Sequence, residues 1–287
     1  MFFIEKYLAI RKKEIDKALD KYLPLNKGLL SKAMRYSIFS GGKRIRPILT
    51  IATVEMLGAK KEEAILPACA IEFIHNFSLI HDDLPCIDND NYRRGKLTLH
   101  KIYNETIALL TGNALLSLAF AILVKNDGAY GDLNPSIKLK IIKEISQAIG
   151  IDGLVGGEIK EISSRGKKLS LNVIDDIYMR KTAALILAAV RIGAIIGGAD
   201  KKEISLLTNY GENIGIAFQI TDDILEFING EAERKKDEPN YVFSSSLKKA
   251  KTVIKEKIKL AKDNLCYFGQ RAKTLLQIAD YITYRKL

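Results

Sequence analysis

The spacing of apolar residues constrains this chain most, because they recur at steps of three and four over long segments. The two clearest stripes are Ile107, Leu110, Ala114, Leu118 and Ala121, and Ile174, Tyr178, Lys181, Leu185, Ala188 and Ile192. Such spacing places side chains on one face of an α-helix, whereas the period-two alternation of a half-buried strand is hard to find. The sequence therefore predicts an all-α fold. Apolar residues also fill the gaps in the first stripe, so we expect that helix to be central and buried.

Clusters of glycine, proline, asparagine and charged residues interrupt the helical segments. They lie at residues 58–60, 126–135, 163–170, 197–202 and 229–240. Helices commonly end at such clusters. None is long enough to link separate domains. We therefore expect the 287 residues to form one domain, residues 1–287, of about ten or more helices.

The composition narrows the class of protein. A chain with 47% apolar and 28% charged residues is not mainly disordered. Its net charge of +11 favours anionic partners such as nucleic acid, a membrane surface or a phosphorylated small molecule. An odd number of cysteines, Cys69, Cys86 and Cys266, indicates reduced thiols and a cytoplasmic location. Residues 183–199 are too short to span a bilayer and Arg191 interrupts them, so we expect no transmembrane segment.

Two segments in the first third of the chain carry charges in an unusual order. Residues 40–47, SGGKRIRP, place two glycines before three cations, as a phosphate-binding turn does, although such a basic loop before a helix is more often a solvated helix cap. Further on, Asp82 and Asp83 end an apolar helical run. Pro85 ends or kinks that helix, so the chain can fold Asp88 back towards Asp82. Clustered carboxylates without thiolates suit Mg²⁺ rather than zinc, whereas the alternative is a charged surface helix end.

The second half of the chain contains a matching pair of segments. In residues 218–226, FQITDDILE, Asp222 and Glu226 are four apart and share a helix face with Gln219. Buried carboxylates need a cation, so we expect either solvent or a metal to face them. Lys181 lies on the apolar stripe described above. It either contacts a ligand or extends its charged end to the surface.

Taken together, these segments resemble the trans-polyprenyl diphosphate synthase family, which includes farnesyl and geranylgeranyl diphosphate synthases. GGKRIRP, HDDLPCIDND-NYRRG, GNALLSLAF, the pair Gly156-Gly157, RKTAALILAAV and FQITDDILE occur in the family's order, from about Leu29 to the C-terminus. The spacer between Asp83 and Asp88 resembles the bacterial and plant-plastid type. The resemblance implies a bundle of antiparallel helices around a deep central cavity, usually a homodimer. It also implies Mg²⁺-dependent condensation of an allylic diphosphate with isopentenyl diphosphate.

The resemblance implies a role for each acidic residue of the two motifs. Three Mg²⁺ ions are expected, two of them bound by Asp82 and Asp88 and the third by Asp222. Asp83, Asp223 and Glu226 would support these metals, with Glu226 as a further ligand. The second motif commonly ends in aspartate, so the glutamate is a departure that reaches one methylene further and still allows ligation through water.

The resemblance also divides the basic and polar residues between the two substrates. The residues expected to hold isopentenyl diphosphate are Lys43, Arg46, His75 and Arg94. Those expected to hold the allylic diphosphate are Arg93, Lys181, Thr182, Gln219 and, from the following loop, Lys236. That loop looks shortened, and Glu238 stands where the family usually places a second lysine.

Product length is expected to depend on the residues that precede the first aspartate motif. Phe77 and Ser78 lie five and four residues before Asp82, or roughly 6–8 Å along a helix. In the family, a large aromatic residue at the fifth position acts as a floor and favours the fifteen-carbon product. Phe77 therefore predicts farnesyl diphosphate, with geranylgeranyl diphosphate as the alternative. An ideal helix turns Phe77 about 140° from Asp82, so a core position packed on a neighbouring helix is the alternative role.

Four other functions compete with this interpretation. A terpene cyclase would lack the GGKRIRP segment, and a non-catalytic subunit of a heteromeric synthase would account for Glu226 and Glu238. A di-iron bundle needs two Glu-x-x-His pairs, and Glu72 with His75 supplies one. A nucleic-acid-binding module would gather its basic residues on one face, whereas here they are scattered.

Overall fold

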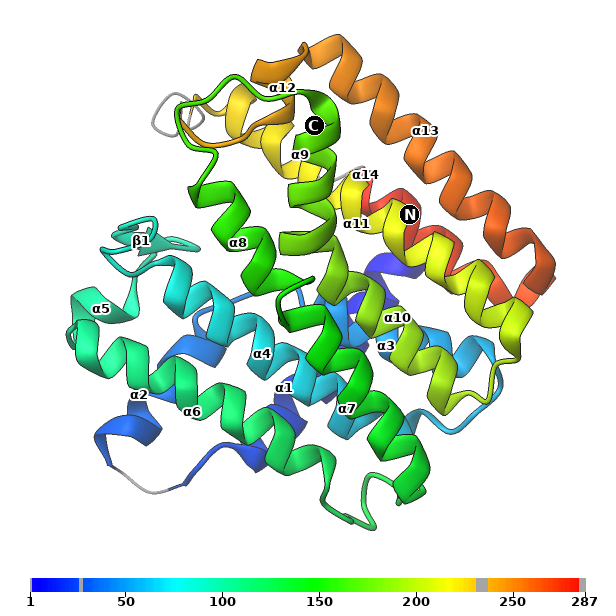
Figure 1. The fold of residues 1–287 in the computed structure, drawn as a ribbon. Helices are drawn as coiled ribbons and strands as arrows, with labels where there is room; N and C mark the ends of the chain where they lie inside the picture. Colours follow the sequence, from blue (N-terminus) through cyan, green and yellow to red (C-terminus); the bar gives the residue numbers. More distant parts are fainter. Residues whose placement is uncertain (1, 26–27, 231–236, 284–287) are drawn as a thin grey trace. The chain divides into compact units, whose positions relative to one another are not determined.

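Helices make up nearly all of the regular structure in this computed structural model, which describes residues 2–25, 28–230 and 237–283 (Figure 1). The prediction of an all-α fold is therefore confirmed. In the described residues the strands are β1 (Tyr92–Arg93) and β2 (Lys96–Leu97), an antiparallel pair that matches Tyr92 with Leu97. This small hairpin follows the first aspartate-rich segment directly.

The chain divides into two compact units. One comprises residues up to Ile51 together with Lys60–Lys138, and the other comprises Ala52–Ala59 together with Leu139–Leu287. The boundary falls within helix α3, and the expected single domain stays a prediction.

In the first unit, helix α4 packs against both α6 and α1, and α2 packs against α6. Pro85 follows shortly after the end of α4, as the sequence predicts. Helix α6 begins where the Asn104 side chain accepts a hydrogen bond from the Ile107 N–H at 2.8 Å. The elements of this unit are α1 (Phe2–Tyr22), α2 (Leu29–Phe39), the first part of α3 (Ile45–Met56), η1 (Lys61–Ala64), α4 (Ile65–Asp82), α5 (Leu99–Ile102) and α6 (Glu105–Leu123).

In the second unit, the long helix α11 packs against α10, α13 and α14. Its start is fixed by a reciprocal capping pair, in which Asp200 and Glu203 each accept a backbone N–H of the other. The remaining elements are α7 (Pro135–Ile149), which begins in the first unit, and α8 (Leu154–Ile162), α9 (Leu171–Tyr178), η2 (Met179–Ala183), α10 (Ala184–Ile196), α11 (Lys201–Ile228), α12 (Tyr241–Ser244), α13 (Leu247–Leu265), η4 (Cys266–Ala272) and α14 (Lys273–Thr283).

Helix α6 differs from the prediction of a central, buried helix. Its buried face contains Ala108, Thr111, Leu115, Ala119 and Ile122, whereas Leu110 of the predicted stripe is 51% exposed. Apolar side chains occur on every side of this helix, so their spacing does not identify the buried face. Packing against α4 selects the face that carries Gly112, where the His81 ring occupies the space of a side chain.

Within the described residues, two segments have the length and composition of membrane spans. Residues Lys61–Asp82 are 83% buried in their most apolar window, as expected of a helix in a protein core. In the corresponding window of Glu105–Leu123, only 39% is buried, so α6 keeps an exposed apolar face in this chain. Length and composition of this kind are weak evidence for a span, because core helices share them.

Candidate active site

The first aspartate-rich segment forms a turn closed by backbone hydrogen bonds. The Asp88 N–H donates to the Asp82 carbonyl at 2.9 Å, and the Ile87 and Asn89 N–H groups donate to the Leu84 carbonyl at 2.9 and 3.1 Å. The chain therefore folds Asp88 back towards Asp82, as predicted. Both aspartates are half-buried.

Asp83, the second aspartate of the motif, pairs with an arginine of the same chain. It is buried, and its Oδ1 accepts a hydrogen bond from Arg93 at 2.5 Å. Arg93 also lies 3.2 Å from Asp90. Burial raises the pKa of Asp83 to about 6, although the charge of Arg93 acts in the opposite direction. Asp83 thus sets the direction of the Arg93 guanidinium at the start of the hairpin.

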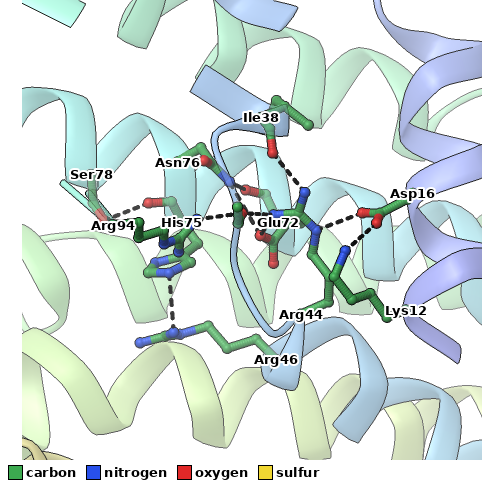
Figure 2. A network of polar contacts seen from close by, with 11 residues as sticks. Lys12, Asp16, Ile38, Arg44, Arg46, Glu72, His75, Asn76, Ser78 and Arg94 are labelled. Atoms are coloured by element: carbon green, nitrogen blue, oxygen red, sulfur yellow. Dashed lines mark hydrogen bonds and ion pairs between the residues drawn. The ribbon is translucent and has the colours of Figure 1, made fainter. Parts of the chain in front are cut away.

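Three of the residues expected to bind isopentenyl diphosphate lie around the glycine turn. Arg94 donates to the Gly41 carbonyl at 2.6 Å, and Arg46 Nη1 lies 3.3 Å from His75 Nε2 (Figure 2). Burial, followed by the charge of Arg46, holds the pKa of His75 well below its usual value. The ring is therefore neutral near pH 7, and its Nε2 can accept a hydrogen bond from Arg46. Lys43, the fourth expected residue, is exposed on the same turn.

The residues expected to control product length pack within the first unit. The Phe77 ring is buried and lies edge-to-face on His81, with 4.6 Å between ring centroids. The His81 Nε2 in turn lies 3.3 Å from the Leu109 carbonyl of α6. Ser78 Oγ donates to the His75 carbonyl at 3.0 Å. The role of Phe77 and Ser78 in product length stays a prediction.

In the second unit, Lys181 is held between two carboxylates of helix α8. Its Nζ lies 2.8 Å from Glu158 Oε2 and 2.5 Å from Glu161 Oε1, and both glutamates are buried. Sequence reasoning did not identify these partners. The signal was present, because Glu158 and Glu161 are three apart and follow Gly156-Gly157, so they share a face of the helix that approaches Lys181.

Lys181 and Thr182 lie on η2, a π-helical turn between α9 and α10. Such turns carry an extra residue and are frequent at functional sites. Two glycines allow neighbouring helices to approach this turn. A Cβ on Gly157 would lie 2.5 Å from the Lys181 backbone N, and a Cβ on Gly215 would lie 2.5 Å from Ala183 Cβ. Both α8 and α11 therefore pack directly on the backbone of η2.

A buried hydrogen-bond network surrounds the second aspartate motif. Asp223 accepts hydrogen bonds from the Tyr178 hydroxyl, from the Tyr241 N–H at 2.7 Å and from Gln219 at 3.2 Å. The Thr182 hydroxyl donates to Gln219 at 2.8 Å. Burial raises the pKa of Asp223 to about 7, and the hydrogen bonds offset only part of this effect. Asp223 thus joins α9, α11 and the start of α12.

Asp222 and Glu226 lie on the same helix as Asp223 but are only half-buried. Glu238 is also half-buried, whereas Lys236 lies outside the described residues. Among residues 2–25, 28–230 and 237–283, no three His, Cys, Asp or Glu side chains come close enough to hold a metal.

Each unit thus places a half-buried aspartate next in the sequence to a buried aspartate that accepts hydrogen bonds, Asp82 beside Asp83 and Asp222 beside Asp223. Accessible carboxylates suit a hard divalent cation such as Mg²⁺. Guanidinium and ammonium groups suit phosphate oxygens. The chemistry of both sets fits a diphosphate accompanied by a metal.

Comparison with known proteins gives a consistent result. Residues 27–240 match the polyprenyl synthetase family. The chain is 39% identical to a geranylgeranyl diphosphate synthase of Cyanophora paradoxa, over 99% of this chain and 97% of that relative. It is 39% identical to a farnesyl diphosphate synthase of Geobacillus stearothermophilus, over 96% and 92% of the two chains. An apo FPP/GFPP synthase structure from Zymomonas mobilis matches with a TM-score of 0.89 and 34% identity, covering 98% of this chain and 99% of that chain.

Proposed function

Since this chain belongs to the polyprenyl synthetase family and is a short-chain prenyltransferase, we propose that it joins an allylic diphosphate head-to-tail to isopentenyl diphosphate, with Mg²⁺ as cofactor. The observation that carries this proposal is the turn in which Asp88 folds back on Asp82. Arg93 and Arg94 follow directly in the sequence, so anionic metal ligands and phosphate-binding cations belong to one segment.

The half-buried carboxylates would hold the metal. These are Asp82 and Asp88 in the first unit, and Asp222 and Glu226 in the second, with three ions expected when substrates are bound. Bound Mg²⁺ neutralises a diphosphate and makes it a better leaving group. Asp83 and Asp223 have protein partners and would support these ligands indirectly.

The cations of this chain would orient the two substrates. Arg93, fixed by Asp83, and Lys181, next to Thr182 and Gln219, would hold the allylic diphosphate. Arg46, which contacts His75, and Arg94, which donates to the Gly41 carbonyl, would hold isopentenyl diphosphate together with Lys43 and His75. When the allylic carbon–oxygen bond breaks, the double bond of isopentenyl diphosphate attacks the allylic carbon. The released diphosphate accepts the final proton, so no side chain needs to act as a general base.

We propose farnesyl diphosphate as the main product, because the buried Phe77 one turn before His81 would limit chain growth. The relatives include both farnesyl and geranylgeranyl diphosphate synthases, so the twenty-carbon product is the second candidate. Phe77→Ala should shift the main product to twenty carbons or longer. An unchanged product spectrum would show that Phe77 only packs in the core.

The experiment that tests the activity uses purified protein, Mg²⁺, isopentenyl diphosphate and each allylic primer, with products separated by chain length. Asp82→Ala should abolish condensation and leave the helical content nearly unchanged. Asp263→Ala is the matched control, because Asp263 is an exposed aspartate on α13. If Asp82→Ala kept more than about a tenth of the wild-type rate, the metal assignment would be wrong. No product from the wild type with any primer would instead favour a non-catalytic subunit.

We also propose that the protein is a cytoplasmic homodimer. The exposed apolar residues on and beside α5 and α6 support a second copy as partner. They are Ile102, Leu109, Leu110 and Val124. All three cysteines are free thiols, which supports a reducing compartment.

A further inference from the structure

Arg44 lies between Lys43 and Arg46 in the sequence, yet it faces the protein interior. Its side chain is 1% exposed, whereas Lys43 is exposed to solvent. Four acceptors surround the guanidinium (Figure 2). They are Asp16 Oδ1 at 2.8 Å, Glu72 Oε1 at 2.8 Å, the Gly41 carbonyl at 3.0 Å and the Ile38 carbonyl at 2.6 Å. Arg44 therefore joins α1, the end of α2, the glycine turn and α4.

The backbone of the turn is shaped to bring Arg44 inward. Arg44 has a φ of 56°, a region that residues with a side chain rarely adopt, and Gly41 and Gly42 have φ values of 123° and 115°. A Cβ on Gly42 would lie 2.6 Å from Arg94 Nη1 and 3.0 Å from Arg44 Nη1. The turn thus passes between two guanidinium groups, and no side chain fits there.

One face of helix α4 contacts both Arg44 and Arg46. Glu72 and His75 are three apart on α4, and they contact Arg44 and Arg46 respectively. Glu72 is only 1% exposed, and Asn76 donates to its Oε1 at 3.2 Å and to its carbonyl at 2.8 Å. A buried carboxylate requires such a partner, so the Glu-x-x-His pair is explained by the two arginines.

We propose that Arg44 is a positioning residue for the isopentenyl diphosphate site. Its guanidinium fixes the Gly41 carbonyl, to which Arg94 also donates, and thereby sets the relative positions of Lys43, Arg46 and Arg94. This inference rests on the proposed function, because it takes that site as given. Lysine cannot replace Arg44, because a single ammonium group cannot reach acceptors on four sides of a planar guanidinium.

The test compares Arg44→Lys with Arg35→Lys. Arg35 is the matched control, because its guanidinium pairs with Asp20 of α1 on the surface. Steady-state kinetics with geranyl diphosphate should give Arg44→Lys a KM for isopentenyl diphosphate raised roughly tenfold, the effect of losing one charged hydrogen bond. The KM for geranyl diphosphate should change less than about twofold, and Arg35→Lys should change neither constant. Asp16→Asn, which removes the negative charge of one half-buried acceptor, should give a smaller rise of the same kind.

If Arg44 had only a general structural role, Arg44→Lys would lower the melting temperature and change both KM values together. That result would overturn the proposal. So would an unchanged KM for isopentenyl diphosphate in a folded Arg44→Lys. If Arg44→Lys does not fold, Asp16→Asn takes its place, since it weakens the hold on Arg44 without touching Arg94, and the same two outcomes decide.

A wild-type protein that makes no prenyl product would contradict the proposed function. Calorimetric binding of isopentenyl diphosphate would then test Arg44 separately, with a roughly tenfold weaker affinity expected for Arg44→Lys. Equal affinity in the two proteins, or no binding by the wild type, would overturn the inference about Arg44.

Discussion

The two aspartates of each motif differ in their surroundings. Asp83 and Asp223 are buried and accept hydrogen bonds from Arg93 and from Tyr178, whereas Asp82 and Asp222 are only half-buried. The buried member shapes the site from within the protein, and the half-buried member is the one that we propose as a metal ligand. Substituting the buried aspartate should therefore mainly lower stability, whereas substituting its half-buried neighbour should mainly lower activity.

The clearest separation is expected between Asp223→Ala and Asp222→Ala. Asp223→Ala leaves the donors from Tyr241 and Gln219 without their acceptor, so it should lower the free energy of unfolding by about 1–3 kcal/mol. Asp222→Ala should lower it less but abolish condensation. Denaturant unfolding of the metal-free proteins and a turnover assay measure the two effects. A larger loss of stability from Asp222→Ala would reverse the assignment.

Lys181 is expected to matter for stability as well as for substrate binding. Lys181→Met would leave Glu158 and Glu161 buried without their cation, so it should destabilise the fold by about 2 kcal/mol, less than for a fully buried pair. Adding Glu161→Gln to that variant should recover part of the loss. Urea denaturation of the single and double variants measures the coupling. A double variant less stable than Lys181→Met would contradict this account.

The neutral state of His75 predicts a dependence of stability on pH. Its pKa is far lower in the folded protein than in the unfolded chain, so the unfolded chain takes up the proton first as the pH falls. Stability is retained above about pH 6.5 and decreases below it, by up to about 1.4 kcal/mol per pH unit. His75→Gln removes this contribution, so the difference in melting temperature between wild type and variant should depend on pH. A constant difference from pH 5 to 8 would contradict the prediction.

The sequence identifies the residue types of the site better than their partners. Asp82, Asp88 and Lys181 were recognisable because spacing and proline placement are local properties. The inward direction of Arg44 was not, because it follows from a positive φ and from acceptors on three other helices. Contacts that join distant segments leave no pattern in a single sequence.

At the level of elements, the π-helical turn η2 depends on the two glycines that pack against it. Gly157→Ala and Gly215→Ala should each displace the turn, because the added Cβ atoms would lie 2.5 Å from its atoms. We expect kcat/KM for the allylic diphosphate to fall at least about tenfold, mainly because its KM rises. Gly128→Ala is the control, since nothing lies within 4 Å of its Cβ position. Wild-type kinetics for Gly157→Ala would show that η2 tolerates displacement.

The ends of the helices were easier to predict than their buried faces. α8, α10 and α11 end directly before predicted breaks, and α6 ends at Leu123, shortly before the break at 126–135, because glycine and proline act locally on the backbone. The buried face of α6 was predicted wrongly, because Leu109 and Leu110 are as apolar as the residues that pack on α4. Only the neighbouring helix determines which side is covered.

At the level of the whole molecule, the exposed face of α6 predicts self-association. Leu110→Glu should convert a dimer into a monomer, because a charge would have to be buried in an apolar interface. Sedimentation velocity of the purified protein measures the change. Leu139→Glu on α7 is the control, since Leu139 is 67% exposed on another helix. A dimer that survives Leu110→Glu would place the interface elsewhere.

The distribution of cysteines gives the native chain a use in spectroscopy. Cys86 in the first compact unit and Cys266 in the second are exposed, whereas Cys69 is buried. Burial also raises the pKa of the Cys69 thiol, so reagents that react with thiolates should leave it unmodified. A donor and an acceptor dye attached to the two accessible thiols would therefore label one position in each unit. Energy transfer between them would report the distance between the two labelled positions without a single engineered residue.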